Sequence, residues 1–339
     1  MSRRPSIFNN KWFYLLLIAF AFSYGLIVGS WKIPPYNFLH QFKDNIISSE
    51  KKPTYIESEV AIREMKQNVV DACKLPLSNE TYSFFVAGHT YGNPKQTDDT
   101  REGLYHPFIK KFNIINECKS ITMGFLLGDV VRESSNKSFE FVKRDLQLID
   151  SKIRKYIVPG NHDVGIGRNN AKRDIFIQNF GKTYKHFEYQ NDLFILLDAN
   201  IDQWNILNDQ LKMLENLSKY DKNYSNVFIF THQTIWHDKK KSSFSRVVPN
   251  SWQGYSKGTN FWDEVFPVIS DIGKTIYLFA GDVGAFPNES EFFYAKHSNV
   301  DFFATGMGGG ERDNFLIISI VNGVVNVALV PLNEAPSSN

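Results

Sequence analysis

The sequence predicts an α/β domain that follows one N-terminal membrane-spanning helix. Short apolar runs recur along the chain, and each is followed by a turn that carries polar residues. Runs of about four to eight apolar residues between turns are typical of strands buried on both faces. An apolar stretch at residues 12–31 predicts the helix. The composition, 42% hydrophobic and 22% charged residues, is that of a globular protein.

The apolar stretch reads WFYLLLIAFAFSYGLIVGSW and contains no ionisable side chain other than tyrosine. As a helix it would span about 30 Å, the thickness of a bilayer core. A buried helix of a soluble protein would carry polar residues at helical spacing, which this stretch lacks. The small-x-small sequence at residues 19–21 resembles a signal-peptide cleavage site, but cleavage there would leave an apolar tail, so a retained signal-anchor fits better.

The cations around this stretch predict its orientation. Arg3, Arg4 and Lys11 precede it, whereas Lys32 is the only cation close behind it. By the positive-inside rule, the N-terminus lies in the cytoplasm and the main domain lies outside it. The protein is therefore expected in a membrane as a single-pass protein. The net charge of +2 gives no basic stripe, so nucleic acid is not expected as a partner.

The chain divides into five predicted parts. A helix at residues 56–73 is expected to pack on the main domain, because its apolar residues recur at nearly helical spacing. The predicted parts are a cytoplasmic N-terminus at 1–11, a transmembrane anchor at 12–31, a stalk and packing helix at 32–80, the main domain at 81–332 and a tail at 333–339.

Within the main domain, the apolar runs predict strands and the amphipathic segments between them predict helices that cover the sheet. The strands are predicted at 83–88, 122–128, 155–160, 193–200, 226–232 and 275–281, and the helices at 207–220 and 261–270. Cys73 and Cys118 each precede a predicted parallel strand. Neighbouring parallel strands start at the same edge of a sheet, so a disulfide and two buried thiols are both compatible with the sequence.

Polar residues come directly after these strands. In open α/β sheets, ligands bind beyond the carboxyl ends of the strands, where loops converge. Oxygen and nitrogen donors without a thiolate suit one or two divalent ions such as Mn, Fe, Zn or Mg. A carboxylate shared between two ions suits phosphoester cleavage, and Asp129 is the candidate for it. The strand-end residues are His89, Asp129, Asn161, His162, Asp163, His232 and Asp282.

Three short motifs resemble those of a known family. GDVV at 128–131, GNHD at 160–163 and TH at 231–232 are similar to the middle motifs of the calcineurin-like metallophosphoesterases. The segment LFILLDAN, the glycine-rich TGMGGG at 305–310 and the strand pair at 314–330 also look like the family's order of elements. The resemblance covers about three quarters of the chain.

The resemblance implies a four-layer α/β/β/α sandwich of the metallophosphoesterase type, in which two sheets are flanked by helices. It implies that Asp129 bridges two metal ions and that Asn161 and His232 hold the second ion. His162 would contact the phosphate or protonate the leaving oxygen, and Asp163 would orient His162.

The first and last motifs depart from the family pattern. The family opens with Asp-x-His, whereas this chain has His89, Thr90 and Tyr91; it closes with Gly-His-x-His, whereas this chain has Asp282 and Gly284 at the two histidine positions. His89 could bind the first ion through its imidazole and Tyr91 through a phenolate, but Gly284 offers no side chain. Asp282 could replace an imidazole at the second ion.

Two functions follow from these residues. The first is a metal-dependent phosphoesterase that hydrolyses a phosphate ester outside the cytoplasm at the membrane, with lipid- or glycan-linked phosphates as candidate substrates. The alternative is a catalytically degenerate domain with a binding or assembly role in an envelope complex. The intact middle motifs favour the enzyme, and the altered opening and closing motifs favour the alternative.

Overall fold

The computed structural model describes residues 65, 69–93, 102–168, 170–219, 224–238, 244–251, 258–272, 275–286 and 291–333. All of them belong to one compact unit that spans residues 55–339. The predicted anchor at 12–31, most of the predicted helix at 56–73 and most of the predicted tail lie outside the described residues. No helix among the described residues is long and apolar enough to cross a bilayer.

The described strands form two sheets. The five-stranded sheet has the order β11-β10-β1-β2-β3, and the six-stranded sheet has the order β4-β5-β6-β7-β9-β8. The strands are β1 Thr81–Gly88, β2 Ile121–Leu127, β3 Arg154–Val158, β4 Lys185–Tyr189, β5 Asp192–Leu196, β6 Val227–Thr231, β7 Ile276–Ala280, β8 Phe292–His297, β9 Val300–Thr305, β10 Asn314–Val321 and β11 Val324–Pro331.

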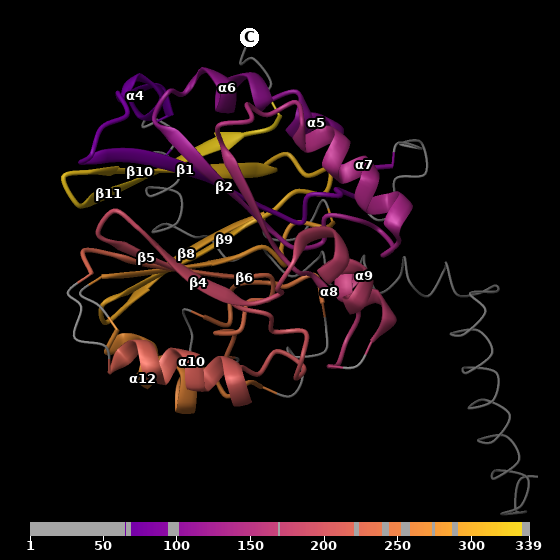
Figure 1. The fold of residues 1–339 in the computed structure, drawn as a ribbon, viewed down its shortest axis with the longest axis vertical. Helices are drawn as coiled ribbons and strands as arrows, with labels where there is room; N and C mark the ends of the chain where they lie inside the picture. The colour runs from indigo at the N-terminus through magenta and orange to yellow at the C-terminus, as the bar shows by residue number, and fades with distance from the viewer. Residues whose placement is uncertain are drawn as a thin grey trace, which may run out of the picture. The chain divides into compact units, whose positions relative to one another are not determined.

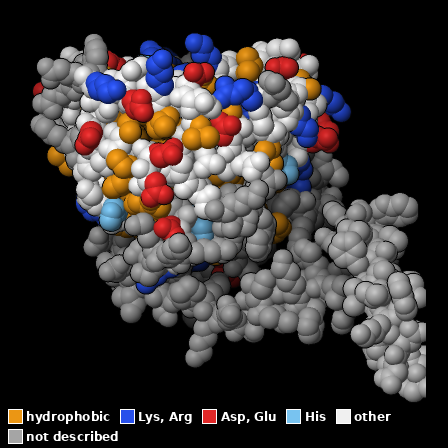
Figure 2. Space-filling model, turned by 90° about the horizontal axis from the view of Figure 1, so that it is seen from below, with side chains coloured by type: hydrophobic (Ala, Val, Ile, Leu, Met, Phe, Trp, Pro, Cys, Tyr) orange, Lys and Arg blue, Asp and Glu red, His pale blue; other side chains and the backbone are white. Residues whose placement is uncertain are grey.

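Helices cover the outer face of each sheet. Figure 1 shows α5, α6 and α7 over the first sheet and α10 and α12 beneath the second. On the side of the molecule that carries α10 and α12, acidic and basic side chains are interspersed among the described residues, as expected for the solvent face of such a layer (Figure 2). The helical segments are α4 Val69–Lys74, α5 His106–Ile109, α6 Phe112–Glu117, α7 Asn136–Leu146, α8 Asn161–Val164, α9 Ala171–Phe180, α10 Asn208–Ser218, the π-helix η2 Phe261–Val265 and α12 Phe266–Ser270.

Three apolar clusters correspond to the three interfaces between these layers. One lies between the sheets and is rich in aromatic rings, such as Phe125, which stacks on Phe230 with ring centroids 3.9 Å apart. A second joins the first sheet to α5, α6 and α7, and a third joins the second sheet to α10, η2 and α12. Every residue of β1 and β6 is buried, as expected for central strands covered on both faces. The predicted two-sheet sandwich is confirmed.

The six predicted strands and the later strand pair are all present, with small differences at their ends. The predicted helix at 261–270 differs, because it begins as the π-helix η2 and continues as α12. Pro267 stands in the first turn of α12, where the missing N–H of proline is tolerated.

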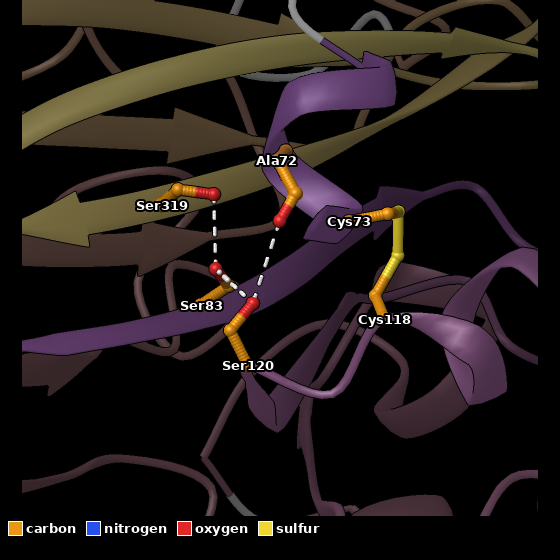
Figure 3. Close-up of a disulfide and its surroundings, with 6 residues drawn as sticks. All are labelled: Ala72, Cys73, Ser83, Cys118, Ser120 and Ser319. Atoms are coloured by element: carbon orange, nitrogen blue, oxygen red, sulfur yellow. Dashed lines mark hydrogen bonds between the residues drawn. A yellow bond between two sulfur atoms is a disulfide. The ribbon is translucent and has the colours of Figure 1, made fainter. Parts of the chain in front are cut away.

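Cys73 and Cys118 form a disulfide. It joins α4 to the residue that ends α6, just before β2, and the parallel pairing of β1 with β2 brings these two segments together. Beside it, the Ser83 hydroxyl lies 3.0 Å from the Ser120 hydroxyl and donates to Ser319 at 2.9 Å (Figure 3). Of the two states that the sequence left open, the structure has the disulfide.

Candidate metal centre

The predicted site residues come together where parallel strands of both sheets end. His89 follows β1, Asp129 stands two residues beyond β2, His232 follows β6 and Asp282 stands two residues beyond β7. β1 and β2 are parallel neighbours in the first sheet, and β6 and β7 are parallel neighbours in the second. The His232 ring links the sheets, because its Nδ1 lies 2.7 Å from the carbonyl oxygen of Leu127 at the end of β2.

The glycine of the GNHD segment allows the loops after β2 and β3 to touch. A Cβ atom on Gly160 would collide with the backbone nitrogen and the carboxylate of Asp129. This close approach lets the Asp129 Oδ1 accept a hydrogen bond from the backbone N–H of His162 at 3.0 Å. This contact fixes the Asp129 carboxylate at the start of α8.

Asp129, His232 and Asp282 form a fully buried group whose ligand atoms all lie within 4.8 Å of one another, so the group could bind a metal ion. His232 Nε2 lies 3.4 Å from Asp129 Oδ1 and 3.6 Å from Asp282 Oδ1. These distances exceed those of ordinary N–H···O hydrogen bonds, about 2.7–3.2 Å. They match the separation of about 3.4 Å between two ligands of a tetrahedral ion with bonds of about 2.1 Å.

The hydrogen bonding of His232 supports the same conclusion. A carbonyl oxygen only accepts, so the contact with Leu127 places a proton on Nδ1 of His232 and leaves Nε2 pointing to the carboxylates. Nε2 is buried and has no hydrogen-bond partner. A lone pair there would face two carboxylates, which requires either a proton or a cation between them. The residues present therefore fit a metal ion.

Without an ion, electrostatics favour the proton. Burial disfavours the imidazolium of His232, but the charges of Asp129 and Asp282 outweigh it and raise the pKa of His232 to about 10. Burial likewise opposes ionisation of Asp129, but the neighbouring histidines outweigh it and hold the pKa of Asp129 below its usual value. Burial raises the pKa of Asp282 to about 7.

His89 lies beside this group. Its Nδ1 lies 3.0 Å from the carbonyl oxygen of Met307, so Nδ1 carries the proton, and Nε2 lies 3.7 Å from Asp129 Oδ2. Burial lowers the pKa of His89 to about 4, which makes the ring neutral near pH 7. Its Nε2 lone pair is therefore available on the side of Asp129 away from His232.

Tyr91 and His162 stand at the entrance of the site. The Tyr91 hydroxyl lies 3.5 Å from His162 Nε2, and the Tyr91 ring packs on His89 with centroids 4.3 Å apart. Burial raises the pKa of Tyr91 above its usual value, so the hydroxyl stays protonated unless a cation binds it. The Arg132 guanidinium lies 5.5 Å from the centre of the Tyr91 ring, whereas Arg168 pairs with Asp202 and Asp209.

The structure differs from the expectation that Asp163 orients His162. The His162 Nδ1 donates instead to the carbonyl oxygen of Arg132 at 2.7 Å. Asp163 accepts hydrogen bonds from the backbone N–H groups of Gly160, Val130 and Val131 at 2.8–3.2 Å. Its carboxylate is buried under the loop and ties the turns after β2 and β3 together, so it positions the site through the backbone.

Ser251 completes the site, although no sequence motif points to it. Its hydroxyl lies 3.1 Å from both Asp282 Oδ1 and Asn161 Oδ1, and its backbone N–H donates to Asp282 Oδ2 at 3.3 Å. The Ser251 hydroxyl thus lies between Asn161 and Asp282 and can donate its one proton to either oxygen. Asn161 was expected as a direct metal ligand, and its oxygen lies at the rim of the Asp129, His232 and Asp282 group.

Gly284 occupies the position of the family's last histidine, and the structure leaves little room for a side chain there. Its φ is +77°, and a Cβ atom would lie 3.1 Å from the carbonyl carbon of Gly306. The turn after β7 therefore packs directly on the glycine-rich loop after β9.

The site opens into a cleft of about 300 Å³. Its lining includes His89, Tyr91, Asp129, Asn161, His162 and Ser251. A ligand in this cleft would reach the carboxylate of Asp129 and the ring of His162 together.

The chain matches no protein-family model and no curated protein. Its fold is similar to that of a solved purple acid phosphatase from yellow lupin (Lupinus luteus), with a TM-score of 0.52 and 10% sequence identity over 76% of this chain and 52% of that chain. This chain thus spans about half the length of the lupin enzyme. The match to a Thermotoga maritima protein solved by NMR covers 74% of this chain and 99% of that chain at 9% identity, with a TM-score of 0.31, which is too low to indicate a shared fold.

The likeness to the lupin phosphatase concerns the fold alone. The described domain shares this two-sheet α/β fold and carries a buried Asp-His-Asp group that could hold a metal ion.

Proposed function

We propose that this chain is a metal-dependent phosphoesterase. The observation that carries the proposal is the orphaned Nε2 of His232, which faces Asp129 and Asp282 at the strand ends of a phosphatase-type fold. A divalent ion held there would supply positive charge that stabilises the negative charge developing on phosphate oxygens. A mixed set of two carboxylates and one imidazole suits Mn, Fe or Zn, and also Mg.

His162 is the proposed general acid. The hydrogen bond from its Nδ1 to the Arg132 carbonyl fixes the ring and turns Nε2 toward the cleft and the Tyr91 hydroxyl. From this position a protonated Nε2 could donate to the leaving oxygen of a phosphoester bound at an ion that Asp129 would hold. Tyr91, protonated and buried, would donate a hydrogen bond to a phosphate oxygen or to His162.

We further propose one well-formed ion site beside a weaker or absent second one. Asp129, His232 and Asp282 supply the first, with Asn161 at its rim. On the other side of Asp129, the described residues that could bind an ion are His89 and Tyr91, because Gly284 has no side chain. The same observation favours a second candidate function, a domain that binds a phosphorylated partner without hydrolysing it.

The proposed place of action is the outer surface of a membrane. The apolar segment at 12–31 and the cations before it support a single-pass anchor with a cytoplasmic N-terminus. The disulfide between Cys73 and Cys118 agrees with an oxidising compartment. Lipid- or glycan-linked phosphates would be the substrates within reach of such a domain.

Metal content and turnover test the proposal together. The full chain, incubated with Mn, Zn or Fe(II) and desalted, is expected to retain about one ion per chain and to hydrolyse phenyl phosphate only with that ion. Asp129→Ala and His232→Ala should lose both properties, whereas His297→Ala, an exposed histidine on β8, should keep both. Metal retained by the wild-type protein without hydrolysis would favour the binding candidate. Absence of metal from the wild-type protein would exclude a metal-dependent enzyme.

A further inference from the structure

The cleft extends beyond the metal centre over a surface of amides and aromatic rings. Its described lining contains no Lys or Arg, and Asp129 is the only carboxylate in it. A phosphate-binding cleft of this size would need added cations if the rest of its substrate were anionic. Besides Ile166 and Ala285, the lining residues outside the metal centre are Asn200, Gln203, Trp204, Gln233, Asn250 and Phe286.

The hydrogen bonds of Gln233 can be assigned from fixed neighbours. The Asn200 Nδ2 donates to the carbonyl oxygen of Pro159 at 2.8 Å, which sets Asn200 Oδ1 as the acceptor end. Gln233 Nε2 donates to that Oδ1, so Oε1 is the remaining end of Gln233. Gln233 is 1% exposed, lines the cleft, and its Oε1 has no hydrogen-bond partner. It is a buried acceptor that needs a donor.

Asn250 presents the complementary group. Its Oδ1 accepts from the backbone N–H of Ala285 at 2.8 Å, which leaves Nδ2 as the free end. Nδ2 is buried without a partner, and Asn250 lines the same cleft. An unpaired buried amide of this kind is unfavourable, so both groups are expected to be paired when the site is filled. A hydroxyl group is both a donor and an acceptor and can satisfy either one.

We infer that the part of the substrate beyond the phosphate is a neutral, hydroxyl-bearing group such as a sugar or polyol. This inference rests on the proposed phosphoesterase function. The free acceptor of Gln233 and the free donor of Asn250 pair with its hydroxyls, and the rings of Trp204 and Phe286 contact its C–H faces. An acyl chain would leave both amides unpaired, and an anionic group would find no cation among the described lining residues.

The test compares leaving groups on the metal-loaded full chain. Glucose 6-phosphate is expected to have a kcat/KM about tenfold or more above that of cyclohexyl phosphate, an alkyl ester of similar size that offers no hydroxyl. Gln233→Met removes the free acceptor at nearly constant side-chain size. It should reduce the ratio of the two kcat/KM values about tenfold, through a higher KM for glucose 6-phosphate. Asn250→Asp keeps the acceptor for Ala285 and replaces the free donor with an acceptor, so it should reduce the ratio independently.

Gln210→Met is the matched control. Gln210 is an equally buried glutamine whose two ends both pair with the backbone of Asp198, and it does not line the cleft. Its variant should be destabilised without a change in the ratio. Equal hydrolysis of the two esters, or an unchanged ratio in Gln233→Met and Asn250→Asp, would overturn the inference while leaving the phosphoesterase proposal intact. If no ester is hydrolysed, the phosphoesterase proposal is contradicted. The inference is then tested by calorimetric binding of glucose 6-phosphate, and it is overturned if Gln233→Met does not weaken that binding.

Discussion

Backbone carbonyl groups decide which nitrogen of each central histidine faces the site. Leu127 and Met307 accept from the Nδ1 atoms of His232 and His89, so both rings turn Nε2 toward Asp129 from opposite sides. Outer partners of this kind fix the orientation of metal-binding histidines in general. The sequence predicted the imidazoles and the carboxylate between them from their places at strand ends, but the carbonyl partners depend on tertiary structure.

Ser251 is a residue of the site that the sequence did not predict. It hydrogen-bonds Asp282 and Asn161, which lie 31 and 90 residues away in the chain. A lone serine in a loop carries no periodic or motif signal, and only the packing of that loop over β7 brings it to the carboxylate. The GNHD motif identified Asp163 as a site residue but predicted the wrong contact for it. A motif shows which residue is present and not which atoms it contacts.

Ser251→Ala is expected to lower the affinity for the divalent ion about 10- to 100-fold, because outer partners of metal ligands contribute about that much. Isothermal titration with Zn or Mn measures the change. Ser270→Ala removes a hydroxyl that bonds only a helix carbonyl, that of Phe266 in α12, and should leave the affinity unchanged. Equal affinities for the wild-type protein and Ser251→Ala would mean that Asp282 is not held by this hydroxyl.

Metal binding is expected to release protons. His232 has a pKa raised to about 10 in the ion-free protein, so it is protonated at pH 8, and an ion bound at its Nε2 must displace that proton. The affinity should therefore rise with pH between about 6 and 9, as proton competition weakens. Calorimetry in buffers with different ionisation enthalpies measures the number of protons released, about one at pH 8. No proton release would show that the ion does not bind His232.

At the scale of elements, the interior strands other than β9 were predicted from the sequence, as were the edge strands β3 and β11, whereas the edge strands β4 and β8 were not. β1, β2, β5, β6 and β7 lie inside the sheets and are continuous apolar runs. β4 and β8 are edges of the second sheet and carry charged side chains such as Lys185 and Lys296. Exposed and half-buried residues alternate along β4, and the last two residues of β8 are exposed. An edge strand packs on one face only, so its sequence carries half the signal.

The disulfide joins two elements whose own packing is small. α4 and α6 are six residues each, and Cys73 and Cys118 are 45 positions apart. A cross-link over a loop of that length is expected to stabilise the fold by about 2–4 kcal/mol, chiefly by restricting the unfolded chain.

Replacing both cysteines with alanine should therefore lower the free energy of unfolding by about 2–4 kcal/mol, measured by urea denaturation. A reducing agent should destabilise the wild-type protein by a similar amount. The same agent should have no effect on the double variant, which serves as its control. If reduction destabilised both proteins equally, the effect would not come from this disulfide.

At the scale of the whole molecule, the predicted anchor and the observed disulfide both concern the compartment in which the described domain lies. A single-pass helix at residues 12–31 with a cytoplasmic N-terminus would place the described domain in a compartment where disulfides persist. The full chain is then expected in the membrane fraction after carbonate washing, with Cys73 and Cys118 oxidised. A chain without residues 1–31 should stay in the cytoplasm of the host with both thiols reduced and open to alkylation. Mass spectrometry after alkylation in intact cells measures the two states. An oxidised pair in the shortened chain, or release of the full chain by carbonate, would contradict the anchor.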